Sequence, residues 1–457
     1  MVPPIHSTGA IMSRYALIDF RHPEKGLANR DQTGTFGSNM KAGGLIGRVI
    51  GKIKSSSTVV PNLTLAYLKA IATQEGKKAV IYSGMPQGEE WILIASSLHH
   101  YKLEIALAQE IKKAFPQSKV GFINAFATTN PELFEEVADF VILGEPEWAL
   151  WKHFRGEQDL VGRVVSEPQL DLDQLPFPQW EKDRLWEYGY FPALSRRPFL
   201  TIQSSRGCPY GCHFCPYLVL QGLPLRRRSN QLVLAELKHL KTEYGVKSVL
   251  FRDIMFSYDM KGTKELVQMI AQANLGIEFG CETRPDHFDD ELIELLKAAQ
   301  FKMVNLGIES PHRDILKASG RKSVKNNRIE KVIKKLERAG IKVQAFYILG
   351  LQEDTKQSME DTIAYSRKLN TFTAQFCILT PFPGTKYYED LDKSLLLTDD
   401  FGRFTEYEPV VDIAGATPGD ILELRDLAFS GYYMRPQWFT KHGVRLGLEL
   451  LVNIFKH

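Results

Sequence analysis

The chain has 457 residues, 44% of them hydrophobic, which is enough for two or three globular domains with sizeable cores. Its 57 Lys and Arg against 54 Asp and Glu leave a net charge of only +3, which argues against a nucleic-acid-binding protein. The N-terminus lacks the pattern of a signal peptide, in which a basic segment leads into an apolar one. The sequence also has no run of about 18 apolar residues, which is the usual minimum for a membrane-spanning helix. We therefore expect a soluble, cytoplasmic protein.

Residues 13–155 alternate between strand and helix patterns. The predicted strands are apolar runs at 15–19, 79–84, 91–98, 119–126 and 140–145. Helices are predicted at 63–76, where Asn62 can cap the start and Gly76 the end, at 101–116, and near Asn130. Helices between continuous apolar strands imply crossover connections, so we expect a doubly wound α/β domain with a parallel sheet.

Residues 156–198 carry scattered prolines and aromatic residues without a period, which is typical of an ordered connector. Six strand patterns follow in residues 199–390, at 199–205, 248–253, 277–284, 303–310, 342–350 and 373–385, with a helix pattern after each of the first five. This order predicts a partial (βα)6 barrel whose site lies at the carboxyl ends of the strands. We expect residues 391–457 to be mostly helical.

Three of the five cysteines, Cys208, Cys212 and Cys215, lie in one short loop after the first barrel strand. A structural zinc site has four ligands, and His213 would have to reverse direction to be the fourth. The other two cysteines lie on separate predicted strands and are interpreted as core or pocket residues. An iron–sulfur cluster with three cysteine ligands fits better, because its fourth iron stays open to a further ligand.

The spacing Cys208-x3-Cys212-x2-Cys215, with Phe214 before the last cysteine, resembles the radical S-adenosylmethionine superfamily. The resemblance implies a [4Fe–4S] cluster on the three cysteines and S-adenosylmethionine on the open iron, with Phe214 beside its adenine. It also implies reductive cleavage of S-adenosylmethionine to a 5′-deoxyadenosyl radical.

Later strand ends extend the resemblance to the cobalamin-dependent branch of the superfamily. The segment FRDIMFSYD matches its first acid at Asp253, although Ile254 departs at the second, and the glycine-containing strand FYILGLQEDT resembles the one beside adenine. The resemblance implies that five residues contact S-adenosylmethionine: Asp253, Glu282, Arg284, Glu309 and Ser310. Taken singly, each acid could equally be a solvated strand end or a structural ion pair.

The N-terminal domain resembles the cobalamin-binding domain of the same branch, with Ser96-x-Leu98 as the element near the cofactor. Two features depart from the pattern. His22 does not have the spacing of a cobalt-binding histidine loop, and Asn124-Ala125 replaces the usual Gly-Gly. Either the domain binds cobalamin, or it only supports the barrel or shapes its substrate.

With cobalamin, the resemblance implies a methyltransferase acting on an unactivated carbon. The alternatives are an oxidative cyclase or rearrangement enzyme and, from another class, an iron–sulfur electron-transfer protein. A methylthiotransferase is disfavoured because no cysteine precedes Cys208. We expect a small-molecule, lipid or peptide substrate and an external electron donor such as flavodoxin or ferredoxin.

Two further segments bear on the substrate. The apolar residues from Val444 to Phe455 predict a helix that docks on its own core or rests on a membrane beside a lipid substrate. Leu225-Arg-Arg-Arg228, soon after the cysteine loop, holds an anionic substrate or forms a solvated turn.

Overall fold

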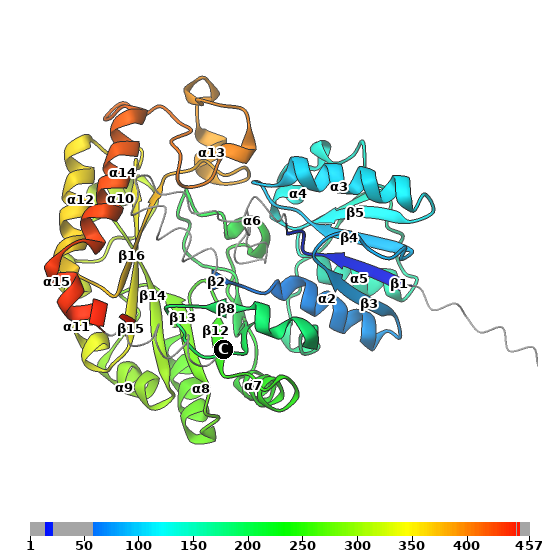
Figure 1. Ribbon diagram of the computed structural model, residues 1–457, viewed down its shortest axis with the longest axis horizontal. Coiled ribbons are helices and arrows are strands. Elements are labelled where there is room, and N and C mark those ends of the chain that lie inside the picture. Colours follow the sequence, from blue (N-terminus) through cyan, green and yellow to red (C-terminus); the bar gives the residue numbers. More distant parts are fainter. Residues whose placement is uncertain (1–13, 22–57, 445, 448–457) are drawn as a thin grey trace, which may run out of the picture.

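Two parallel sheets lie side by side in the computed structural model, which describes residues 14–21, 58–444 and 446–447 (Figure 1). The first sheet, in blue and cyan, has the strand order β3-β1-β4-β5-β6-β7. Its strands are β1 (Arg14–Ile18), β3 (Lys78–Tyr82), β4 (Trp91–Ala95), β5 (Lys119–Ile123), β6 (Phe140–Leu143) and β7 (Gly162–Val165). Its helices are α2 (Leu63–Gln74), α3 (Tyr101–Ala114), α4 (Ala125–Thr129) and α5 (Pro146–Phe154).

The central strands of the first sheet are continuously apolar because helices cover both faces of the sheet. In β4 the residues from Ile92 to Ala95 are all buried, as expected for a parallel strand between two helical layers. Helix α2 begins as predicted, because the Asn62 side chain accepts from the Leu65 amide at 3.2 Å. The expectation of a doubly wound α/β domain is confirmed.

The predicted connector does more than link the two sheets. It adds a strand to the first sheet and packs against the second. Strand β7 is the edge of the first sheet, and its mostly exposed pattern explains why no apolar run revealed it. The antiparallel pair β2 (Thr58–Val59) and β8 (Gly189–Tyr190) joins the connector to the segment before α2. Leu194 then packs at Gly280 inside the barrel, and Pro192 accepts a bond from Lys342 Nζ at 2.9 Å. The connector therefore closes the end of the barrel opposite the strand carboxyl ends.

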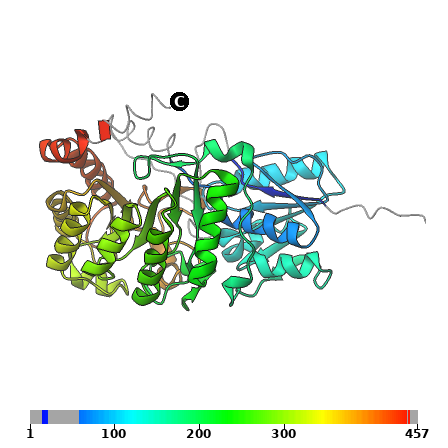
Figure 2. The ribbon, with the colours of Figure 1, turned by 90° about the horizontal axis from the view of Figure 1, so that it is seen from below.

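The second sheet is the predicted six-stranded partial barrel, with the order β16-β15-β14-β13-β12-β9 and all pairs parallel. Its strands are β9 (Phe199–Ile202), β12 (Ser248–Phe251), β13 (Glu278–Thr283), β14 (Phe301–Glu309), β15 (Lys342–Leu349) and β16 (Thr373–Ile378). The helices around it are α7 (Asn230–Tyr244), α8 (Met260–Ala273), α9 (Asp290–Ala298), α10 (Arg313–Ala318), α11 (Asn326–Arg338) and α12 (Lys356–Leu369), and Figure 2 shows them along its outer side.

The C-terminal part begins with α13 (Lys386–Asp390), and residues 391–417 are mostly irregular with short 3-10 turns. Helices α14 (Pro418–Tyr433) and α15 (Pro436–Trp438) and a π-helical turn (Phe439–Gly443) follow. The ring of Phe429 on α14 lies 5.4 Å from that of Phe376, so α14 covers the outer face of β16. The helical C-terminal segment is thus confirmed over 418–444, whereas most of the apolar stripe that follows lies outside the described residues.

Candidate functional site

The cysteine loop leaves the carboxyl end of β9 and is closed by a short antiparallel ribbon, β10 (Ser205–Arg206) with β11 (Arg226–Arg227). Helix α6 (Leu218–Gln221) lies between the loop and the ribbon's return strand. Gly207 has φ +86°, and a Cβ there would lie 2.1 Å from the Pro224 carbonyl oxygen, so only glycine fits. The Cys208 amide donates to the Gly222 carbonyl at 3.2 Å, which fixes the first cysteine.

The three loop cysteines form one electrostatic cluster of free thiols. Cys208 and Cys212 are buried, and Cys215 is partly buried. Desolvation raises the pKa of Cys215, and the neighbouring Cys212 and Cys208 raise it further. Desolvation and Cys212 likewise raise the pKa of Cys208, while Arg284 and Arg321 oppose the rise. The loop backbone joins two of the cysteines, because the Cys215 amide donates to the Cys212 carbonyl at 3.1 Å.

Arg321 links the cysteine loop to the end of β14. Its Nη1 lies 4.0 Å from Cys212 Sγ, and its Nη2 lies 3.1 Å from Glu309 Oε1 and donates to the Gly307 carbonyl at 2.8 Å. Glu309 has a left-handed backbone, φ 63°, where the β14–β15 register shifts. Such strain costs about 1–3 kcal/mol and is common at functional sites. Burial raises the pKa of Glu309, and Arg321 and Arg284 oppose that rise.

Arg284, at the end of β13, has one guanidinium nitrogen without a partner. Its Nε lies 2.9 Å from Asp286 Oδ1, its Nη2 donates to the Lys322 carbonyl at 2.6 Å, and its guanidinium stacks 4.6 Å from the Tyr210 ring centroid. Its Nη1 is buried and has no hydrogen-bond partner among the described residues. A buried donor without a partner is costly, and an acceptor atom of a bound ligand would satisfy this nitrogen.

The other four barrel residues predicted to bind S-adenosylmethionine lie at the same edge. Asp253 is buried, and its oxygens accept from the Ser204 hydroxyl at 2.6 Å, the Ser204 amide at 3.0 Å and the Ser205 hydroxyl at 2.5 Å. Its contacts therefore position the segment that enters the cysteine loop. Ser310 Oγ lies 3.4 Å from Thr362 Oγ1 and accepts from the His312 amide at 3.2 Å.

Glu282 and Phe214 also line this edge of the barrel. Glu282 is partly exposed and pairs in register with Asn305, so it faces the barrel interior with that residue. Phe214 packs on a small apolar cluster of Leu316, Leu351, Leu379 and Tyr387. The roles of all these residues in binding S-adenosylmethionine stay predictions.

His213 is held by the loop after β14. Its amide donates to the Ser319 carbonyl at 3.1 Å, and a Cβ on Gly320 would lie 2.4 Å from its ring. No group of three His, Cys, Asp or Glu side chains is arranged around a single metal ion in the described ranges. A four-iron cluster has a different requirement, since each cysteine binds a separate iron.

The carboxyl edge of the first sheet holds the residues predicted to lie near cobalamin. Ser96 and Leu98 are fully buried, and the Ser96 hydroxyl donates to the Ile123 carbonyl at 2.8 Å and accepts from the Ala127 amide at 3.0 Å. Asn124 has φ 83° and ψ −174°, a conformation that is essentially restricted to glycine. The chain thus keeps glycine-like backbone geometry where its sequence lacks the expected Gly-Gly. The histidine loop after β1 falls outside the described residues, apart from its first positions.

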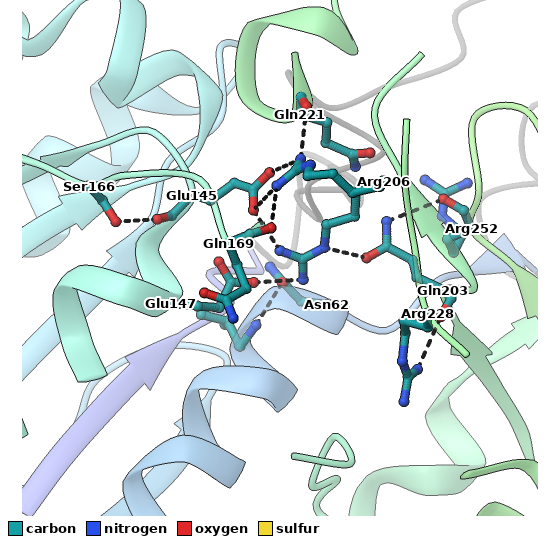
Figure 3. A network of polar contacts seen from close by, with 12 residues as sticks. Asn62, Glu145, Glu147, Ser166, Gln169, Gln203, Arg206, Gln221, Arg228 and Arg252 are labelled. Atoms are coloured by element: carbon teal, nitrogen blue, oxygen red, sulfur yellow. Dashed lines mark hydrogen bonds and ion pairs between the residues drawn. The ribbon is translucent and has the colours of Figure 1, made fainter. Parts of the chain in front are cut away.

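A buried ionic network, absent from the sequence-based expectations, joins the first sheet to the cysteine loop (Figure 3). Arg206 Nη1 donates to Glu145 Oε2 at 2.9 Å, and its Nη2 donates to Glu147 Oε1 at 2.8 Å. Arg226 also pairs with Glu145, its Nη1 lying 3.1 Å from Oε2. Glu145 is the N-cap of α5, which follows β6, Glu147 lies in the first turn of α5, and Arg206 is two residues before Cys208. In the sequence, Glu145 follows Gly144 and Arg206 precedes Gly207, but this pattern does not show that the two residues pair.

The arginine run after the loop is not a solvated turn, because each of its arginines is paired with a carboxylate of another element. Arg226 belongs to the buried network, Arg227 lies 2.8 Å from Asp259, and Arg228 lies 2.6 Å from the buried Glu236. The expectation of a solvated turn is therefore wrong, and a role of this run in holding an anionic substrate stays a prediction. Each arginine was assigned from sequence proximity alone, which does not show the carboxylates of other elements.

No helix in the described part of the chain is long and apolar enough to cross a membrane.

Residues 202–365 match the family model of the radical SAM superfamily. An uncharacterized methyltransferase of Pyrococcus horikoshii is 30% identical over 285 residues, 61% of either chain. An anaerobic magnesium-protoporphyrin IX monomethyl ester cyclase of Rubrivivax gelatinosus is 27% identical over 278 residues, 59% of this chain and 48% of the cyclase. The matches thus span less than two thirds of these relatives.

Among solved structures, the fold resembles the radical S-adenosylmethionine methyltransferase TsrM from Kitasatospora setae, solved with cobalamin and a [4Fe–4S] cluster bound. The TM-score is 0.66 at 14% identity, and the match covers 90% of this chain and 85% of that chain. At this identity the likeness concerns the fold, and it includes both sheets. The order of domains in this chain is therefore that of a known two-domain architecture.

Proposed function

We propose that the chain, whose residues 202–365 match the radical SAM family model, reductively cleaves S-adenosylmethionine at a [4Fe–4S] cluster held by Cys208, Cys212 and Cys215. The observation that carries this proposal is the set of three free thiols in one loop, with Arg321 Nη1 4.0 Å from Cys212 Sγ and with a buried Arg284 Nη1 that has no hydrogen-bond partner among the described residues. When bound, the cluster would supply the electron that splits the sulfonium into methionine and a 5′-deoxyadenosyl radical.

The residues around the loop fit this pair of cofactors. Arg284 and Arg321 place positive charge beside the thiols, which favours thiolate ligands despite the desolvation of the loop. The free Arg284 nitrogen suits a carboxylate such as that of the methionyl group, because a charged hydrogen bond satisfies its buried donor. Burial raises the pKa of Glu309, so its carboxylate is stabilised by nearby cations or hydrogen-bond donors. The amine or the ribose hydroxyls of S-adenosylmethionine would supply such a group.

We place cobalamin at the carboxyl edge of the first sheet. The backbone of Asn124 supports this site, because it keeps a glycine-like conformation at the carboxyl edge of the sheet, where the expected Gly-Gly would stand. The buried and fully bonded Ser96 hydroxyl holds α4 at this edge, so its contribution would be to orient the backbone around the ligand. Bound there, cobalamin would supply a methyl group to the barrel site.

The reaction best supported is therefore methyl transfer to an unactivated carbon of a small-molecule, lipid or peptide substrate. Relatives named as methyltransferases and a fold shared with a cobalamin-bound methyltransferase support this choice. The second candidate is an oxidative cyclisation, and the cyclase relative supports it. Both candidates need an external electron donor, because none of the described groups can supply an electron at each turnover.

One experiment separates these possibilities. The protein would be reconstituted anaerobically with iron, sulfide and cobalamin, and its visible spectrum recorded to detect each cofactor. Dithionite and S-adenosylmethionine would then be added, and 5′-deoxyadenosine measured by chromatography. The proposal requires cluster absorption and 5′-deoxyadenosine, and a cluster-loaded protein that forms none would contradict it. Transfer of a labelled methyl group from S-adenosylmethionine to cobalamin would favour the methyltransferase over the cyclase.

A further inference from the structure

One segment carries a charge unlike the rest of the chain. Residues 313–338, which include α10 and α11, contain ten Lys and Arg and three Asp and Glu, a net charge of +7 against +3 for the whole chain. The rest of the chain is therefore net negative. Such a local excess of one sign creates a potential that attracts partners of the opposite charge.

The excess is not cancelled inside the protein. The two glutamates of α11 are paired with lysines from elsewhere, Glu330 with Lys368 at 2.8 Å and Glu337 with Lys441 at 2.9 Å. Lys317, Lys322 and Lys325 are exposed and make no ion pair with any residue that the structure describes. Their charge therefore faces solvent.

The same segment touches the cysteine loop. The Ser319 carbonyl accepts from the His213 amide at 3.1 Å, and Arg321 Nη1 lies 4.0 Å from Cys212 Sγ. The Lys322 carbonyl accepts from Arg284 at 2.6 Å. The exposed side chains of Lys317 and Lys322 therefore belong to the same short segment as Ser319 and Arg321, which contact the cysteine loop.

Aromatic side chains adjoin these cations. Tyr210, in the cysteine loop, has its hydroxyl 2.8 Å from His287 Nε2, and its ring centroid lies 5.8 Å from that of Tyr258, which is 37% exposed. Arg284 connects Tyr210 to the basic segment, because its guanidinium lies 4.6 Å from the centroid of that ring and donates to the Lys322 carbonyl at 2.6 Å. Pro209 and Gly211, on either side of Tyr210, are exposed. A tyrosine beside a basic rim is typical of a protein-binding surface.

We propose that this basic face, defined by Arg313, Lys317, Lys322, Lys325 and Tyr258, is the docking surface of an acidic one-electron carrier protein. The inference rests on the proposed function, because a cluster held by the cysteine loop needs one electron from outside for each cleavage. In this step the reduced carrier loses one electron and the oxidised cluster gains it, and no bond is made or broken.

Charge and position together favour such a carrier over other anionic partners. Opposite charges raise the association rate of two proteins, and an electron needs a short path from donor to acceptor. The basic face meets both needs, since Lys317 and Lys322 lie close in sequence to Arg321, whose Nη1 is 4.0 Å from Cys212 Sγ, and the Lys322 carbonyl accepts from Arg284. A polyanion or a lipid surface would gain nothing from contact with the cysteine loop.

The test uses the reconstituted holoenzyme and an acidic flavodoxin as the probe. Stopped-flow spectroscopy would follow oxidation of the flavodoxin hydroquinone, and calorimetry would measure binding of the oxidised flavodoxin. In the K317E/K322E variant we expect the rate constant and the affinity to fall by about tenfold or more at low salt. The wild-type rate should also fall as salt is added. The K238E/K241E variant is the matched control, because these lysines are exposed on α7, away from α11 (Figure 1).

A small reductant, photoreduced 5-deazaflavin, separates docking from chemistry. It should reduce the cluster and give 5′-deoxyadenosine equally in all variants, because it needs no docking surface. Flavodoxin rates and affinities that ignore the charge reversal would overturn the proposal. So would binding of transfer RNA or phosphatidylglycerol vesicles that K317E/K322E abolishes while flavodoxin binding persists. If wild-type enzyme forms no 5′-deoxyadenosine even with deazaflavin, the proposed function itself fails.

Discussion

Arg206 and Glu147 pair across the interface of the two sheets, with Nη2 2.8 Å from Oε1 and both side chains 1% exposed. A buried pair is weak evidence for net stability, yet removing one partner leaves a charge without compensation. Arg206 is also the residue before Gly207 and the cysteine loop. The pair thus couples the position of the loop to the first sheet.

We expect the Glu147→Gln variant to lose about 3–5 kcal/mol of the free energy of unfolding, because Arg206 keeps a buried charge with one carboxylate fewer. Urea unfolding monitored by circular dichroism would measure the loss. Glu135→Gln is the control, since Glu135 pairs with Arg163 at the surface and its loss should leave the midpoint almost unchanged. Equal midpoints for both variants would show that the buried network does not contribute as argued.

The assignment of three cluster ligands predicts different outcomes for two cysteines. The Cys215→Ala variant should lose the visible absorption of the reconstituted cluster and all 5′-deoxyadenosine formation, because an iron loses its thiolate. Cys377→Ala should retain both, because Cys377 belongs to β16 and not to the loop, and its Sγ accepts from Gln375 Nε2 at 3.7 Å. Iron content and the absorption spectrum would be measured side by side. Loss of the cluster in Cys377→Ala as well would contradict the assignment.

The unpartnered Nη1 predicts how Arg284 contributes. Arg284→Lys keeps the positive charge but loses the planar guanidinium with its several N–H donors. S-adenosylmethionine should therefore bind about 10- to 100-fold more weakly, which corresponds to the loss of one charged hydrogen bond. The iron content should not change, since Arg284 is not a ligand. Equilibrium dialysis with S-adenosylmethionine gives the affinity. The control is Arg196→Lys, because Arg196 is exposed and donates to the Gly276 carbonyl at the other end of the barrel. Equal affinities in the two variants would remove Arg284 from the binding site.

The elements with strong local patterns could be predicted from the sequence. Buried parallel strands are continuous apolar runs, so the six strands of the barrel and five of the first sheet were found in order. The cysteine spacing identified the loop because cluster ligation demands it. Strand β7 was missed because its residues are mostly exposed and show no apolar period.

Contacts between distant segments could not be predicted in this way. Arg226 and Arg228 have no partner nearby in sequence, and Glu145 and Glu236 reach them only in the folded chain. Asp253 was expected beside S-adenosylmethionine, but its hydrogen bonds go to Ser204 and Ser205. A sequence motif gives the residue type at a strand end, whereas the neighbouring strands decide which group it contacts.

Asn124 provides a test of the first sheet. Because φ is 83° and ψ is −174°, an alanine there should be strained by about 1–3 kcal/mol relative to glycine, which adopts this conformation freely. We therefore expect Asn124→Ala to unfold at lower urea than Asn124→Gly, and both substitutions remove the same side-chain contacts. If the backbone forms part of the cobalamin site, Asn124→Gly should also retain cobalamin absorption after gel filtration, whereas Asn124→Ala should lose part of it. Equal stability of the two variants would show that the glycine-like backbone is not maintained in solution.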